Sequence, residues 1–136
     1  MAGLAGLAAC SAMIPVTIGG SLEHPTATFG VDPGKREKAC LGGLAVHEAA
    51  NAMMRPVWTV SAHGRDCRRL KQVVYGQAPG GFVADVPAQA LKPGVRYSVV
   101  GYGWTGWPAA TPWRGGGDFI FEDGQWRSAP PFVPGR

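Results

Sequence analysis

The chain has 136 residues, of which 46% are apolar and 16% are charged; 21 are glycine, 12 are proline, and the formal net charge is +4. This apolar content argues against a disordered protein, and the glycine and proline argue against long helices, because both residues break a helix interior. One domain of short strands joined by many turns is therefore expected. Beyond the apolar N-terminal stretch, no segment approaches the length of a membrane-spanning helix.

The basic residues form two short clusters, at residues 35–38 and 65–71, and each cluster is interrupted by an acid. We interpret both as solvated loops. Contact with anionic lipid headgroups or a cell-wall polymer is the alternative. Nucleic-acid binding would need a recognition motif in addition to such a patch, and we find none, so no nucleic-acid partner is expected.

The chain opens on a small-residue apolar stretch that ends Leu7-Ala8-Ala9-Cys10. This stretch resembles the lipobox of bacterial lipoproteins. The resemblance implies that residues 1–9 are the end of a signal peptide and that Cys10 carries a lipid with acyl chains such as palmitate. A signal peptide normally begins with a positive segment and a longer apolar run, so we expect the leader to begin upstream of Met1. The alternative is a small-residue N-terminus that feeds the first strand.

The lipobox resemblance also implies a location. We expect a bacterial cell-envelope protein that is held by the lipid on Cys10 and needs no other cofactor. Ser11 follows Cys10, whereas Asp at this position retains enterobacterial lipoproteins in the inner membrane. The expected location is therefore the outer membrane, with the domain facing the periplasm. The expected partners are the membrane and an envelope protein, a glycan or peptidoglycan.

Four extended segments are expected in the first half of the chain, at residues 13–18, 26–31, 40–48 and 56–62. The last two are expected to pair as an antiparallel hairpin with residues 48 and 56 opposite each other, so that paired residue numbers add up to about 104. In this hairpin Trp58 and Val60 point toward the core.

The same hairpin predicts a disulfide bond between Cys40 and Cys67. Cys40 is expected near residue 64, only a few residues from Cys67, which is near enough for the Cα separation that a disulfide needs. The lipid would occupy Cys10, the third cysteine, and the compartment is oxidising. The alternative is a pair of buried free thiols.

Further strands are expected at residues 68–75 and 82–86, the second at a sheet edge because Pro87 cannot donate to a ladder.

Residues 91–99 then resemble the segment that leads into the sixth strand of fibronectin type III and related immunoglobulin-like sandwiches, Leu-x-Pro-Gly-x-x-Tyr-x-Val. The resemblance implies that Leu91 plugs one end of the core and that the Tyr97 hydroxyl ties the corner back to the backbone. The expected fold is all-β, a small antiparallel β-sandwich of about seven short strands. Such a resemblance implies no activity.

Residues 101–117 are rich in tryptophan and glycine and are expected to form a long loop. This loop holds the candidate ligand-binding residues, Tyr102, Trp104, Trp107, Trp113 and Arg114, whose rings could form a platform for sugars or peptides. In two other interpretations the rings cover one end of the core, or they enter the bilayer interface beside the anchor.

A hairpin with a two-residue Asp123-Gly124 turn is expected at residues 118–127. The domain would span residues 10–127, and residues 128–136 would form a flexible proline-rich tail.

No catalytic motif is present, and no enzymatic activity is expected. His24, His47, His63, Met53 and Met54 could ligate copper or zinc, but their irregular spacing assembles no defined ligand set, so no metal site is assigned. A periplasmic metal-binding protein is the alternative function. A small hydrolase using Ser61, His63 and Asp66 is a third. The preferred function is a structural or binding module without catalysis.

Overall fold

The computed structural model describes residues 12–13, 15–29, 40–51, 55–62, 72–105 and 111–129. Among these residues the secondary structure is β-strand apart from one short 3-10 turn, Ala49–Asn51, and no described helix is long and apolar enough to cross a membrane. The predicted all-β class is confirmed. Several predicted features lie outside the described residues: the leader at 1–9, Cys10, Cys67, Trp107, residues 130–136, and the candidate ligands His63, Met53 and Met54.

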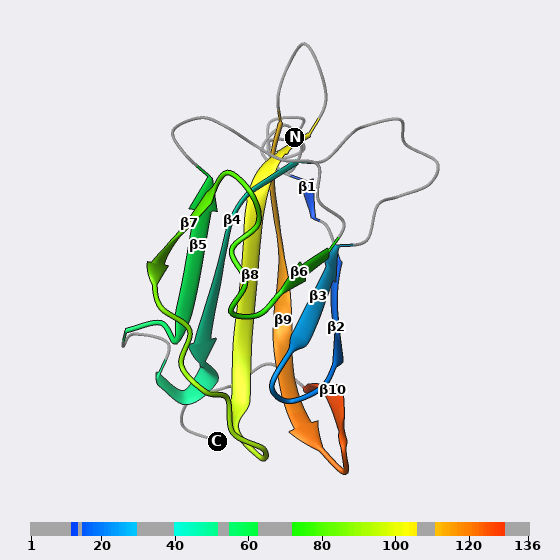
Figure 1. The fold of residues 1–136 in the computed structure, drawn as a ribbon. Coiled ribbons are helices and arrows are strands. Elements are labelled where there is room, and N and C mark those ends of the chain that lie inside the picture. The colour runs from blue at the N-terminus through cyan, green and yellow to red at the C-terminus, as the bar shows by residue number, and fades with distance from the viewer. Residues whose placement is uncertain are drawn as a thin grey trace, which may run out of the picture.

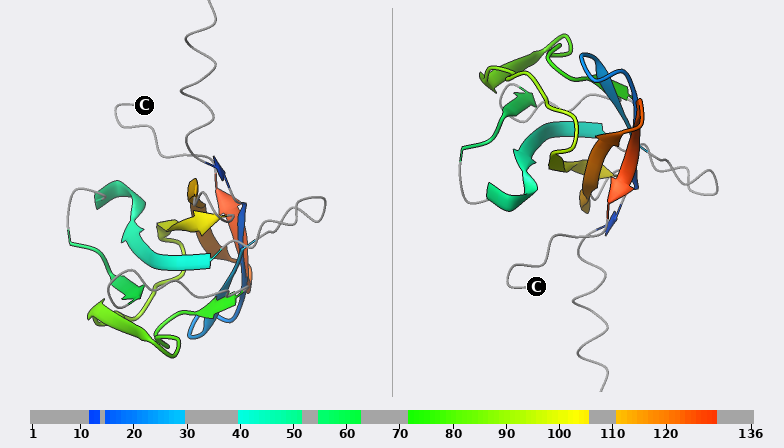
Figure 2. Two further views of the ribbon diagram at one scale, coloured as in Figure 1. Left: turned by 90° about the horizontal axis from the view of Figure 1, so that it is seen from above. Right: turned by 90° about the horizontal axis from the view of Figure 1, so that it is seen from below.

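The strands form two sheets that pack face to face (Figure 1). The larger sheet has the order β1-β9-β8-β4-β5-β7, with β10 also paired to β9, and the smaller sheet has the order β2-β3-β6. Figure 2, which looks along the strands, shows the two layers. The strands are β1 (Ala12–Met13), β2 (Val16–Gly20), β3 (Pro25–Phe29), β4 (Cys40–Glu48), β5 (Trp58–Ala62), β6 (Gln72–Val74), β7 (Phe82–Val86), β8 (Arg96–Thr105), β9 (Thr111–Glu122) and β10 (Gln125–Ala129).

This arrangement is a β-sandwich, and six of its strands have the order found in immunoglobulin-like sandwiches. β2, β3 and β6 lie in the order of strands A, B and E, and β9, β8 and β4 lie in the order of strands G, F and C. β5 extends the second sheet next to β4, and β7 lies at its edge as predicted. All pairs are antiparallel except β1 with β9. The described residues form more strands than the predicted seven, partly because β1 and β10 both line the outer edge of β9.

The hairpin of β4 and β5 has the predicted register. Its four described pairs run from Gly43 with Ser61 to Val46 with Trp58, and in each pair the residue numbers add up to 104. Trp58 and Val60 are each 1% exposed and point into the core, as predicted. Alternation of apolar and polar residues fixes this register, because a slip by one residue would turn both side chains to solvent.

The corner before β8 has the predicted tyrosine. The Tyr97 ring is buried, and its hydroxyl oxygen accepts a hydrogen bond of 2.8 Å from the backbone N–H of Lys92. Leu91 is partly buried and packs against the core cluster. Both expectations from the resemblance are confirmed. The hydrogen bond joins the backbone at Lys92, which precedes β8, to the side chain of Tyr97, the second residue of β8.

Removing the Tyr97 hydroxyl should therefore destabilise the domain. Tyr97→Phe leaves the N–H of Lys92 without its acceptor, and we expect the free energy of unfolding to fall by about 1–2 kcal/mol. Tyr102→Phe is the matched control, since Tyr102 is an exposed tyrosine of the same strand. Urea denaturation followed by circular dichroism measures both variants, and equal effects would contradict the structural role of the corner.

The predicted loop at residues 101–117 is wrong. β8 continues to Thr105 and β9 begins at Thr111, so the glycine-rich stretch forms a strand pair within the large sheet. Glycine has a low strand propensity by itself, but here the glycines face the close-packed interior or neighbouring backbone. The predicted tail also begins too early, because β10 runs to Ala129.

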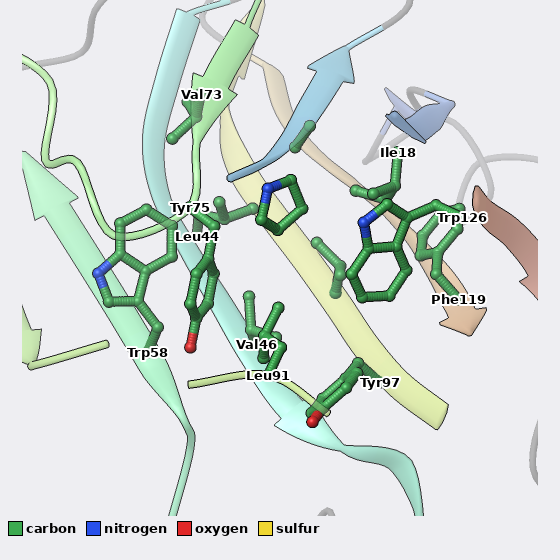
Figure 3. A pocket seen from close by; sticks show the side chains of 13 residues that line it. Ile18, Leu44, Val46, Trp58, Val73, Tyr75, Leu91, Tyr97, Phe119 and Trp126 are labelled. Atoms are coloured by element: carbon green, nitrogen blue, oxygen red, sulfur yellow. The ribbon is translucent and has the colours of Figure 1, made fainter. Parts of the chain in front are cut away.

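The core between the sheets contains a small apolar cavity of about 30 Å³ (Figure 3). The ring of Tyr75 lies at one side of it against Trp58, with ring centroids 5.0 Å apart, and Trp126 lies at the other side. This volume has room for little more than one water molecule, and its lining offers water no polar partner. The cavity is therefore a packing gap rather than a ligand site.

Tyr75 closes this side of the sandwich. Its hydroxyl donates a hydrogen bond of 2.7 Å to the carbonyl oxygen of Gln89 and lies 3.3 Å from that of Val57. It therefore joins the end of β6 to the segment after β7 and to the start of β5. Burial raises the pKa of Tyr75 to about 12.

This raised pKa predicts a loss of stability at high pH. Above pH 10, the ordinary tyrosine value, the unfolded chain releases the Tyr75 proton while the folded chain keeps it. The stabilisation is complete below pH 10 and should disappear as the pH rises toward 12. Urea denaturation at a series of pH values should show a steeper fall for the wild type than for Tyr75→Phe, and parallel curves would contradict the assignment.

Candidate ligand-binding surface

The hairpin of β8 and β9 separates the predicted binding residues between the two faces of the large sheet. Trp113 points inward and is 2% exposed, whereas Trp104 and Tyr102 point outward and are 37% and 42% exposed. Arg114 is also exposed. Trp113 therefore covers the core, as one of the interpretations above has it. Tyr102 and Trp104 lie on the outer surface instead.

Inward-facing glycines of β8 make the space that Trp113 fills. A Cβ atom on Gly101 would lie 2.9 Å from Cε1 of Phe29, and one on Gly103 would lie 2.8 Å from Nε1 of Trp113. The same Nε1–H donates a hydrogen bond of 2.8 Å to the carbonyl oxygen of Cys40. The Trp113 ring also meets Phe29 edge-on at 5.8 Å. Trp113 thereby links β9 to β4 and to the small sheet.

A β-bulge in β4 supports the two outward rings. Leu41 pairs with Gly103 and Gly43 pairs with Tyr102, so the register shifts at Gly42. A Cβ atom on Gly42 would lie 2.8 Å from Cζ3 of Trp104, and one on Gly43 would collide with the Tyr102 ring. Each ring therefore rests on bare backbone on one side. This support restricts the rings, so little side-chain entropy remains to be lost on binding.

A row of paired residues crosses the large sheet at the level of Tyr102. From β9 to the edge strand β7 it contains Arg114, Tyr102, Gly43, Ser61 and Val83. With strands about 4.8 Å apart, the row is about 19 Å long. It begins with a cation on β9 and ends with an apolar side chain on β7, and the Tyr102 ring lies next to the cation.

The exposed apolar side chains of the described residues gather on this face. The three large hydrophobic residues that are most exposed are Val83 at 43%, Tyr102 and Trp104. Val83 shares the outer face because it pairs with Ser61, which alternates with the inward Val60. Arg114 is exposed and forms no ion pair with any described residue. The arrangement can stack on a ring or apolar group and bind an anion beside it.

Cys40 lies at the start of β4 and is in a disulfide bond. Its partner lies outside the described residues, so the pairing with Cys67 stays a prediction. The backbone at Cys40 pairs with Trp104 and accepts the hydrogen bond from Trp113. The disulfide is therefore attached to β4 at the residue whose backbone contacts both Trp104 on the outer surface and Trp113 in the core.

The structure also shows where the described residues lie that were considered for a hydrolase or for a metal-binding protein. The Ser61 hydroxyl donates a 2.8 Å hydrogen bond to Asp85 of β7, and not to a histidine among the described residues. His47 lies in β4 and His24 in the turn before β3. Among the described part of the chain, no three His, Cys, Asp or Glu side chains lie close enough to hold a metal ion.

Sequence reasoning missed Gly42, Gly43, Ser61 and Val83 as parts of the outer surface. A signal was present, because the run Gly101-Tyr102-Gly103-Trp104 alternates small and large residues with the period of a strand. Comparison with family models, with curated proteins and with solved structures finds no match to this chain.

Proposed function

We propose that this protein is a small lipoprotein of the bacterial cell envelope, anchored by a lipid on Cys10, and that its β-sandwich acts as a non-catalytic structural or binding module. The lipobox resemblance at Leu7-Ala8-Ala9-Cys10 supports the anchor. The expected compartment is the periplasmic side of the outer membrane. In this proposal the domain uses no metal or organic cofactor.

One observation carries the binding role. The most exposed large hydrophobic side chains in the described part of the chain lie on one face of the large sheet, and two of them, Tyr102 and Trp104, are neighbours on β8 and rest on glycine backbone. Exposed aromatic residues gathered on one face mark an interaction site more often than scattered ones do. We therefore assign the partner-binding surface to Tyr102, Trp104 and Arg114.

Metabolic labelling with palmitate tests the anchor. The native gene is expressed together with the DNA upstream of Met1, and the protein should incorporate label and fractionate with the envelope. Cys10→Ala should abolish the label, whereas Cys40→Ala should retain it and serves as the matched cysteine control. Label on the Cys10→Ala protein, or none on the wild type, would refute the lipoprotein assignment.

A further inference from the structure

We infer that the surface formed by Tyr102, Trp104 and Arg114 docks onto the phospholipid surface beside the anchor, with anionic headgroups bound by Arg114. This inference rests on the proposed lipid at Cys10 and names the partner of the same surface. It makes protein–lipid contact a second attachment in addition to the acyl chains.

The pairing of β1 carries this inference. Ala12 pairs with Trp113 and Met13 pairs with Arg114, so the N-terminal strand enters the fold directly beside the candidate surface. Cys10 precedes Ala12 by two residues, which span at most about 7 Å. On β9 the neighbour of Trp113 is Pro112, and Pro112 pairs with Trp104. A lipid on Cys10 therefore brings the bilayer to the end of the sandwich where Trp104 lies, the end at which β1 is drawn in Figure 1.

The side chains at this end have the chemistry of a bilayer interface. Tryptophan and tyrosine are enriched where headgroups meet water, because their rings are apolar and carry one polar group. Arg114 pairs with Tyr102, two residue pairs along the strands from the pair of Trp104 with Pro112. A guanidinium near an anionic leaflet contributes about 1 kcal/mol.

The charge of the sequence is complementary to such a surface. β3 ends and β4 begins at this end, and β5 ends and β6 begins there as well. The sequence between β3 and β4 and that between β5 and β6 hold the two basic clusters of the chain. The net charge of +4 is thus concentrated in connections that start and finish on the anchored side.

The size of the surface also favours a membrane. A stable protein partner usually covers about 800 Å² on each side, whereas the large exposed apolar groups among the described residues are two aromatic rings and one valine. Two rings and one arginine suit a weak contact that adds to the attachment by the acyl chains.

Vesicle flotation tests the docking without the anchor. The full chain carrying Cys10→Ser, which cannot be lipidated, is mixed with vesicles of phosphatidylethanolamine and phosphatidylglycerol in equal parts, or of phosphatidylcholine alone. Adding Trp104→Ala should lower the partition coefficient about tenfold on both kinds of vesicle. Adding Arg114→Gln should lower it about fivefold on the anionic vesicles and leave it unchanged on phosphatidylcholine.

Arg127→Gln is the matched control, because Arg127 is an exposed arginine of β10 at the opposite end of the sandwich. Circular dichroism and the melting temperature verify that each variant is folded. The inference is overturned if Trp104→Ala floats like its parent, or if Arg127→Gln and Arg114→Gln lose equal binding. It is also overturned if the parent does not bind vesicles but binds purified peptidoglycan through Trp104. Palmitate labelling is independent of these results, so the anchor and the docking can fail separately.

Discussion

Gly103→Ala should lower the free energy of unfolding by about 3 kcal/mol or more, one of the largest effects expected from adding a methyl group to a described glycine. The added Cβ would overlap the carbonyl oxygen of Cys40 and would lie 2.8 Å from Nε1 of Trp113. These two atoms form the hydrogen bond that joins β9 to β4. The Cys40 carbonyl belongs to a paired strand and cannot turn away as a side chain can, so the strands must separate locally or the hydrogen bond must break.

Gly19→Ala is the matched control for this substitution. Gly19 also lies in a strand, β2, and a Cβ there would meet nothing within 4 Å. We expect a change within about 0.5 kcal/mol, as for most exposed sites. Guanidinium denaturation of both variants measures the difference. If Gly103→Ala were as stable as Gly19→Ala, the close approach of β8, Trp113 and β4 would not be present in solution.

Loss of the Cys40 disulfide is expected to have an effect of similar size. With Cys67 as the partner, the crosslink closes a loop of about 27 residues, and the chain-entropy model assigns it roughly 3–4 kcal/mol. Cys40→Ala should lower the free energy of unfolding by that amount under oxidising conditions. Under reducing conditions the variant and the wild type should have nearly equal stability.

The same experiment identifies the partner of Cys40. If the pairing is Cys40 with Cys67, then Cys67→Ala should match Cys40→Ala, and the double variant should lose no more than either single variant. Cys10→Ala should keep full stability, because Cys10 carries the lipid in our proposal and takes no part in the disulfide. An equal loss in Cys10→Ala and Cys40→Ala would place Cys10 in the disulfide and remove the basis for the anchor.

The parts of the fold that follow local rules were predictable from the sequence. The β4–β5 register follows from apolar alternation around Trp58 and Val60. The last hairpin follows from Asp123-Gly124, whose positive φ angles of 54° and 78° suit a tight two-residue turn. In this hairpin Phe121 pairs with Trp126, as the turn predicts.

The β8–β9 pair was not predictable in the same way, because its stability comes from distant parts of the chain. Gly101 and Gly103 weaken a strand when considered alone, and they are favourable only with Phe29, Trp113 and Cys40 around them. The prediction of the candidate surface was affected by the same error, because it assumed a loop. A loop would have kept the tryptophans together, whereas strand alternation sends Trp113 into the core and leaves Trp104 outside.

The position of β1 also determines how far the domain would reach from the proposed anchor. β1 pairs near the first residues of β9, and β9 then runs through 12 residues to the Asp123-Gly124 turn. At about 3.3 Å per residue, that turn lies about 33 Å beyond Trp113, the first residue of β9 that pairs with β1. With the N-terminus held at a bilayer, the turn between β9 and β10 is the part of this hairpin best placed to meet molecules that never approach the membrane.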